Sequence, residues 1–135
     1  MASSDLSTLL QTLHVKQHEG VWRFETIPAE QATWADLISL RSARDIAMLF
    51  MEDEGPTLIL KAEEDTPEDN RWHWLELAVF SDLHAVGFIA AVAKALASAG
   101  VPCNTVAGFH HDHVFVPIGK TSEALAAIEA LKQVG

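Results

Sequence analysis

The sequence predicts an α+β protein made of two halves, and three observations lead to this prediction. The chain has 135 residues, a length that suits one compact domain or two small halves that share a core. Its most polar stretch is Ala62–Arg71, where acidic residues, a proline and an asparagine disfavour both helix and strand. Beyond it, the periodicity runs strand, helix, strand, strand, helix. We therefore expect an N-terminal half at residues 1–66 and a C-terminal half at residues 72–135.

The N-terminal half is expected to contain a helix, several strands and one hairpin. Leucines recur at helical spacing over Leu6–Leu13, and Ser4 or Asp5 can cap the first turn of this helix. Residues 21–27 alternate between apolar and polar side chains, as a half-buried strand requires. The other expected elements are a short strand near Leu13–Gln17, a short helix over Thr33–Leu40, and a hairpin of Ile46–Met51 and Thr57–Lys61 joined by Glu52–Pro56.

The C-terminal half has clearer signals. The alternation over His73–Phe80 predicts a strand with Leu75, Leu77 and Val79 on one face. An apolar helical stripe follows, from a cap at Ser81 or Asp82 to about Ala99, and Gly100 and Pro102 end it. The remaining expected elements are strands over Val101–Ala107 and Val114–Pro117 and a helix over Thr121–Lys132.

Composition excludes several classes of partner and location. Nine basic and nineteen acidic residues give a net charge of -10, so the protein repels phosphate backbones and anionic lipid surfaces. We expect no nucleic acid and no membrane as partners, because the apolar stretch Val86–Ala99 is interrupted by Lys94 and is shorter than the roughly 20 residues of a spanning helix. The N-terminus lacks the basic residues of a secretory signal, and the single cysteine, Cys103, cannot form an internal disulfide. These features favour a cytoplasmic protein.

Residues His84–Val106 resemble the first helix and second strand of an ACT domain, a ferredoxin-like regulatory fold. The matching residues are Gly87, Gly100, Val101 and Asn104. The turn before the helix departs from the family, because Ser81–Gly87 is longer than the common Asp-X-Pro-Gly loop and contains no proline.

Three motifs are still more similar to those of a small bacterial group of tandem ACT-like proteins. They are Ala85–Phe88 (AVGF), Cys103–Asn104, and Gly108–Pro117 (GFHHDHVFVP), and Glu54–Leu60 is also similar to that group. The resemblance implies a ferredoxin-like fold of two ACT-like halves that share antiparallel sheets with helices on one face. It also implies a homodimer. We further expect three elements of the N-terminal half to complete the C-terminal half: the first helix, the strand near Leu13–Gln17, and Val21–Ile27.

The loop from Ser81 to Phe88 is the candidate ligand site. It opens a helix, where free backbone N–H groups and the positive end of the dipole attract an anion such as the carboxylate of an amino acid. If Ser81 caps the helix, Asp82 can meet the ligand's ammonium group; if Asp82 caps it, those donors are occupied. In the alternative interpretation the loop is only a capped helix start and Gly87 a packing contact. The candidate ligand-binding residues are Ser81, Asp82, Leu83, His84, Val86, Gly87, Phe88 and Asn104.

The histidine-rich stretch Ala107–Pro117 favours a hairpin tip over a metal site. In an extended strand His111 and His113 share one face and His110 and Asp112 the other, so at most two of the four converge, whereas zinc needs three or four donors. Cys103 is expected to face the core, where a thiol is inert. The tryptophans Trp34, Trp72 and Trp74 are better explained by core or interface packing than by a ligand shelf.

Together these features predict a non-enzymatic regulatory protein that binds a small molecule, expected to be an amino acid, near an interface between halves or subunits. No catalytic residue, no cofactor and no metal is expected. Two alternatives stay open: a ligand-free protein interaction module, and a metal-binding protein that uses the His110–His113 stretch.

Overall fold

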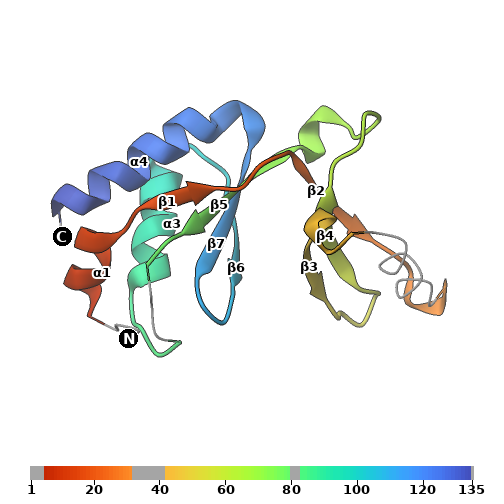
Figure 1. Ribbon diagram of the computed structural model, residues 1–135, viewed down its shortest axis with the longest axis horizontal. Coiled ribbons are helices and arrows are strands. Elements are labelled where there is room, and N and C mark those ends of the chain that lie inside the picture. Colours follow the sequence, from red (N-terminus) through yellow and green to blue (C-terminus); the bar gives the residue numbers. More distant parts are fainter. Residues whose placement is uncertain (1–4, 32–41, 80–82, 135) are drawn as a thin grey trace. The chain divides into compact units, whose positions relative to one another are not determined.

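The structure is a computed structural model that describes residues 5–31, 42–79 and 83–134. It divides into two compact units, one built from Met1–Glu19 with Trp72–Gly135 and the other from Gly20–Arg71. We call them the terminal unit and the central unit (Figure 1). The helix expected over Thr33–Leu40 lies outside the described residues, as does Trp34.

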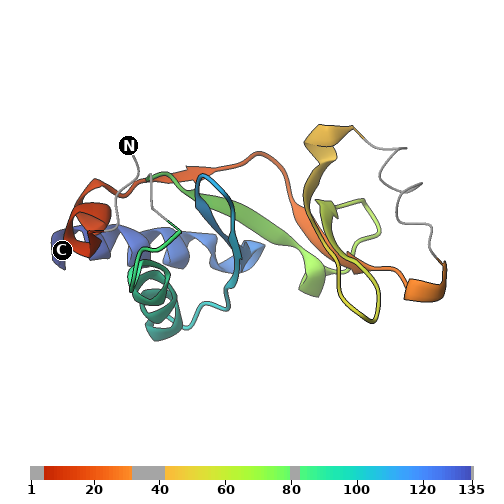
Figure 2. The same ribbon diagram turned by 90° about the horizontal axis from the view of Figure 1, so that it is seen from below.

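The terminal unit contains an antiparallel sheet in the order β1-β5-β7-β6. Its strands are β1 (Val15–Gln17), β5 (Trp72–Leu77), β6 (Asn104–Ala107) and β7 (Asp112–Pro117). Three helices pack on one face of this sheet, as Figures 1 and 2 show: α1 (Leu6–Thr12), α3 (Phe88–Ser98) and α4 (Thr121–Val134).

The core of the terminal unit lies between this sheet face and the helices. Leu75 and Leu77 of β5 point to it, and both are fully buried, as the alternation in the sequence predicted. Leucines from α1 and its C-cap, with the apolar stripes of α3 and α4, complete it: Leu9, Leu13, Phe88, Val92, Leu96, Ala124 and Ile128. The prediction that the first helix and the following short strand complete the C-terminal half is therefore confirmed. The third element of that prediction, Val21–Ile27, belongs instead to the central unit, where it pairs with Thr57–Lys61. Asp5 caps α1 by accepting a hydrogen bond from the Thr8 backbone N–H at 3.1 Å.

The central unit contains an antiparallel sheet in which β4 (Thr57–Lys61) pairs with both β2 (Trp22–Thr26) and β3 (Ile46–Phe50). The predicted hairpin of β3 and β4 is confirmed. Leu58, Ile59 and Leu60 are fully buried in the middle strand. Short 3-10 turns stand at Ala29–Gln31, Ala43–Asp45 and Glu68–Asn70, and a fourth, Ile118–Lys120, precedes α4 in the terminal unit.

Several boundaries differ from the sequence prediction: β5 ends at Leu77 and not at the expected Phe80, and β6 begins at Asn104 and not at the expected Val101. Two further differences affect the candidate sites. Helix α3 begins at Phe88 and not at a cap on Ser81 or Asp82, because Gly87 has a φ of 90°, a left-handed conformation that no helical residue adopts. Strand β7 begins at Asp112, two residues before the expected Val114, so that His113 is a strand residue paired with Val106 and not part of the hairpin tip.

Within the described ranges, each helix is too short or too polar to cross a bilayer.

Candidate functional site

The candidate ligand loop leads into α3, and the structure describes it from Leu83 onward. Ser81 and Asp82 lie outside the described residues, and Leu83 and His84 form an exposed turn. Gly87 is the N-cap of α3 and has no side chain with which to cap the helix, whereas Phe88 turns into the core and is 2% exposed. The helix start therefore presents backbone N–H groups and the positive end of the α3 dipole.

Position 87 needs a glycine because of its backbone conformation, and not because a side chain there would clash with neighbouring atoms. A Cβ placed there would have the Leu6 side chain of α1 as its nearest neighbour, at an ordinary contact distance of 3.5 Å. Its φ of 90° is the constraint, since side-chain-bearing residues rarely adopt it. Leu83 and Val86 beside it are 68% and 84% exposed.

Asn104 does not join the loop. Through the strand pairings, Asn104 is level with Phe115 of β7 and so with Trp74 of β5. The loop, however, begins beyond Leu77, the last residue of β5. Asn104 therefore stands three positions along the sheet from that end, roughly 10 Å at the usual rise of a strand. The other candidate ligand residues that the structure describes are consecutive neighbours in the loop and at the start of α3.

In the histidine-rich hairpin, the side chains of His110, His111, Asp112 and His113 do not converge on one point. The tip is closed by a hydrogen bond from the Gly108 N–H to the His111 carbonyl at 2.9 Å, and His110 is exposed beside Phe109. His111 folds back, with Nδ1 3.2 Å from the Val79 carbonyl oxygen. Asp112 and His113 are half-buried strand residues on opposite faces of the sheet.

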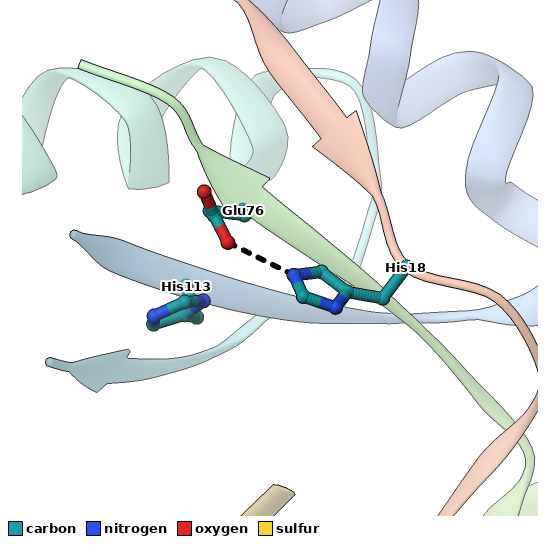
Figure 3. Close-up of side chains that lie close together, drawn as sticks. All are labelled: His18, Glu76 and His113. Carbon is teal, nitrogen blue, oxygen red and sulfur yellow. Dashed lines mark hydrogen bonds and ion pairs between the residues drawn. The ribbon is translucent and has the colours of Figure 1, made fainter. Parts of the chain in front are cut away.

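His113 belongs to a cluster on the sheet face away from the helices, together with His18 and Glu76 (Figure 3). The potential ligand atoms of these three residues all lie within 4.8 Å of one another. Nε2 of His18 lies 2.9 Å from Oε1 of Glu76, and Nε2 of His111 lies 3.7 Å from Oε2 of the same carboxylate. Glu76 is thus placed among three imidazoles, and we call His18, Glu76 and His113 the histidine–glutamate cluster.

Strand pairing produces this arrangement. Glu76 pairs directly with His113 across β5 and β7, and the His18 N–H bonds to the Trp74 carbonyl at 3.0 Å, which continues the β1–β5 ladder by one residue. His18, Trp74, Glu76 and His113 consequently lie on one face, because side chains two positions apart in a strand point the same way.

Trp74 connects the two histidines of the cluster. Its ring stacks on His18, with centroids 3.7 Å apart and an interplanar angle of 3°, and its indole N–H donates to Nδ1 of His113 at 2.9 Å. The ring of Phe115 stacks on Trp74 at 5.7 Å. These contacts hold both imidazoles in fixed orientations around the carboxylate.

Burial and charge shift the pKa of several groups here. Burial opposes the ionisation of Glu76, but the His18 hydrogen bond and the neighbouring histidines outweigh it and hold the pKa of this carboxyl below its ordinary value. Burial lowers the pKa of His113, with the Glu76 charge acting in the opposite direction. Burial also raises the pKa of the Cys103 thiol, which packs against the core and so fits the inert cysteine that the sequence predicted.

Sequence reasoning did not include His18, Glu76 or Trp74 in any site. Lys16 is the Cα partner of Glu76, and His18 follows it by two residues. If the alternation of β1 is continued past its last residue, His18 therefore points to the same sheet face as Glu76. The pairing itself joins residues 58 positions apart, and the sequence offers no signal for its register.

The central unit contains a polar pocket of about 340 Å³. Arg23 lies in its wall, with Nε 3.0 Å from Glu25, while Nη1 donates to the Lys61 carbonyl at 2.7 Å and lies 3.5 Å from Glu63. Its guanidinium is therefore already matched by carboxylates and a carbonyl. The lining residues are Arg23, Phe24, Glu25, Glu63, Asp65, Thr66, Pro67 and Asn70.

Comparison with protein families finds two matches in tandem. A family model described as an ACT domain matches residues 2–66, and a second ACT domain model matches residues 71–132. No curated protein matches the chain.

Solved structures include close matches in fold. A Vibrio cholerae protein of unknown function, described as a possible transport protein, is 33% identical, with 95% of this chain and 96% of that chain covered and a TM-score of 0.77. The ligand-free regulatory subunit of aspartate kinase from Thermus thermophilus is 13% identical, covers 87% and 97% of the two chains, and has a TM-score of 0.64. An Agrobacterium tumefaciens protein is 15% identical, with 89% of each chain covered and a TM-score of 0.68.

Proposed function

Because the chain belongs to the ACT-domain family, as a tandem of two such domains, we propose that it is a regulatory protein whose ligand is an amino acid. The tandem ACT match by itself supports a regulatory role that depends on binding a small molecule, and ACT domains are regulatory, not catalytic. The finer elements of the proposal are the amino acid, its position in the loop Ser81–Phe88, and a homodimer.

The observation that carries the proposal is the start of α3. Gly87 adopts a left-handed conformation and brings no side chain to the first turn, so this residue does not itself occupy the N–H groups that a carboxylate would bind. Asp82 precedes Gly87 in the same loop of the sequence, and its carboxylate would supply the charge for the ligand's ammonium group. The exposed Leu83 and Val86 suit coverage by the ligand's side chain or by a second copy of the chain.

Binding would act by favouring one arrangement of the chain or its assembly, since a ligand shifts an equilibrium only through differential affinity. Its effect would then reach another protein or change the oligomeric state.

The test is a thermal-shift screen of the twenty L-amino acids, followed by calorimetric titration of each hit. An amino acid at 100 times its Kd stabilises the folded state by about 2.7 kcal/mol, which such a screen detects. Sedimentation with and without the ligand reports whether the chain is a dimer. A screen in which none of the amino acids binds refutes the proposed ligand class.

Two glycines that flank α3 give a matched pair of variants for locating the ligand. Gly87 and Gly100 stand at opposite ends of the helix with φ of 90° and 73°, so Gly87→Ala and Gly100→Ala introduce similar backbone strain. Only Gly87→Ala should weaken binding. Loss of binding in Arg23→Gln with retention in Gly87→Ala would instead place the ligand in the pocket of the central unit.

A further inference from the structure

We propose that the histidine–glutamate cluster is a binding site for one divalent transition-metal ion of the zinc class, held by His18, Glu76 and His113. This site is separate from the loop before α3, and it does not depend on the amino acid proposed above.

The first argument is geometric. The three side chains come from three strands or strand ends that pair with one another, and their potential ligand atoms lie within 4.8 Å of one another (Figure 3). An ion at about 2.0–2.2 Å from each donor, with tetrahedral angles, needs donors about 3.3–3.6 Å apart. Side-chain rotations that shorten the longest of these separations by about 1 Å would therefore close the site.

The second argument is chemical. Two imidazole nitrogens and one carboxylate oxygen suit zinc, cobalt, nickel or iron(II) better than the hard cations calcium and magnesium, which prefer oxygen ligands. Three protein ligands leave further positions for water or a small anion. The side chains of His18 and Glu76 are 23% and 14% exposed, so the site is sheltered but can be reached from solvent.

The third argument is the support around the ligands. His18 is held by stacking on Trp74, and Glu76 is approached on its second oxygen by Nε2 of His111 at 3.7 Å. Metal sites ordinarily have such outer contacts, which orient the ligands before the ion arrives.

Two existing hydrogen bonds must give way when the ion binds. The ion replaces the proton that lies between His18 Nε2 and Glu76 Oε1, and this proton moves to Nδ1 of the same ring. A neutral imidazole has one free lone pair, so His113 cannot bind the ion and still accept the indole N–H of Trp74. Metal binding must therefore change the environment of Trp74.

The experiment is a titration of the full chain with Co²⁺ and with Zn²⁺, followed by calorimetry and by the visible absorption of bound cobalt. We expect one ion per chain. His18→Gln, Glu76→Gln and His113→Gln should each weaken binding by at least tenfold, and their circular dichroism without metal shows whether each variant is folded. Glu76→Gln keeps the size of the side chain, removes its charge and replaces one acceptor oxygen with a donor NH₂ group.

The matched controls are His14→Gln and His110→Gln, which remove exposed histidines outside the cluster, and Cys103→Ser, which removes the single thiol. All three should bind the ion as the unaltered chain does. Loss of binding in His110→Gln would show adventitious capture by the exposed hairpin tip. A cobalt spectrum with thiolate charge-transfer bands, or no stoichiometric binding by the unaltered chain, would equally overturn the proposal.

Tryptophan emission gives a readout that needs no variant of a ligand. Zn²⁺ should change the emission of the unaltered chain, and Trp74→Phe, which keeps an aromatic ring beside His18, should remove that change. Stoichiometric zinc binding with unchanged tryptophan emission would place the ion elsewhere and refute the assignment.

Discussion

The terminal and central units are stabilised in different ways. Among the described residues of the terminal unit, three helices cover one sheet face, and a continuous core of thirteen buried residues joins them to the sheet. In the described part of the central unit, loops are fastened to the sheet and to one another by polar contacts. Asn70 bonds to the backbone of Phe24, and the Arg71 guanidinium donates to the carbonyls of Thr66 and Glu63.

Because of this difference, different kinds of substitution should destabilise the two units. A packed core loses stability when volume is removed, because the cavity persists. A unit fastened by partly buried hydrogen bonds loses stability when one partner is removed and the other is left unsatisfied. The following predictions run from the largest expected effect to the smallest.

Leu9→Ala should produce the largest effect, about 2–5 kcal/mol of lost stability, because Leu9 is fully buried where α1 meets the core of the terminal unit. Denaturant unfolding measures the loss, and hydrogen exchange should show that α1 and β1 lose protection while β2–β4 do not. Leu6→Ala on the same helix is the control, since Leu6 is 36% exposed. Equal losses for the two variants would contradict the assignment of α1 to this core.

Asn70→Ala should destabilise the central unit by about 1–3 kcal/mol. Its amide accepts from the Phe24 N–H at 3.0 Å and donates to the Phe24 carbonyl at 2.9 Å, as a neighbouring strand would. Both backbone groups of Phe24 lose a partner in the variant. Hydrogen exchange at Phe24 measures the effect directly. Asn104→Ala, at an exposed asparagine of the terminal unit, should leave Phe24 unchanged.

The smallest effect concerns pH. Burial lowers the pKa of His73, whose Nδ1 lies 2.6 Å from the Thr121 hydroxyl at the start of α4. As the pH falls, His73 is therefore protonated near pH 6.5 in the unfolded chain and only at a lower pH in the folded chain. Stability contributed by neutral His73 is present above this pH and is lost as the pH falls through the lowered value.

Thermal unfolding between pH 7 and pH 5 tests this sign. His73→Gln should reduce the fall in Tm of the terminal unit, whereas His14→Gln, at an exposed histidine, should not. An identical fall in the unaltered chain and in His73→Gln would show that His73 takes no part in the acid sensitivity.

Much of the fold could be predicted because local patterns specify local structure. The strand Thr57–Lys61 and the core-facing Leu75 and Leu77 were identified by alternation and composition alone. The start of α3 was predicted wrongly, since the cap signal at Ser81 and Asp82 was given more weight than the conformational freedom of Gly87. The ligand residues of the loop stay a prediction.

The sequence by itself determined the two-part α+β architecture, the inward faces of its strands and helices, and the resemblance to tandem ACT domains. These depend on residue periodicity and on short motifs, which neighbouring residues fix. Only the tertiary structure brought His18, Glu76 and His113 together, because the registers of β1, β5 and β7 decide which residues become neighbours. Register is set by the packing of the whole sheet against its helices, and a shift of one residue would have turned Glu76 into the core.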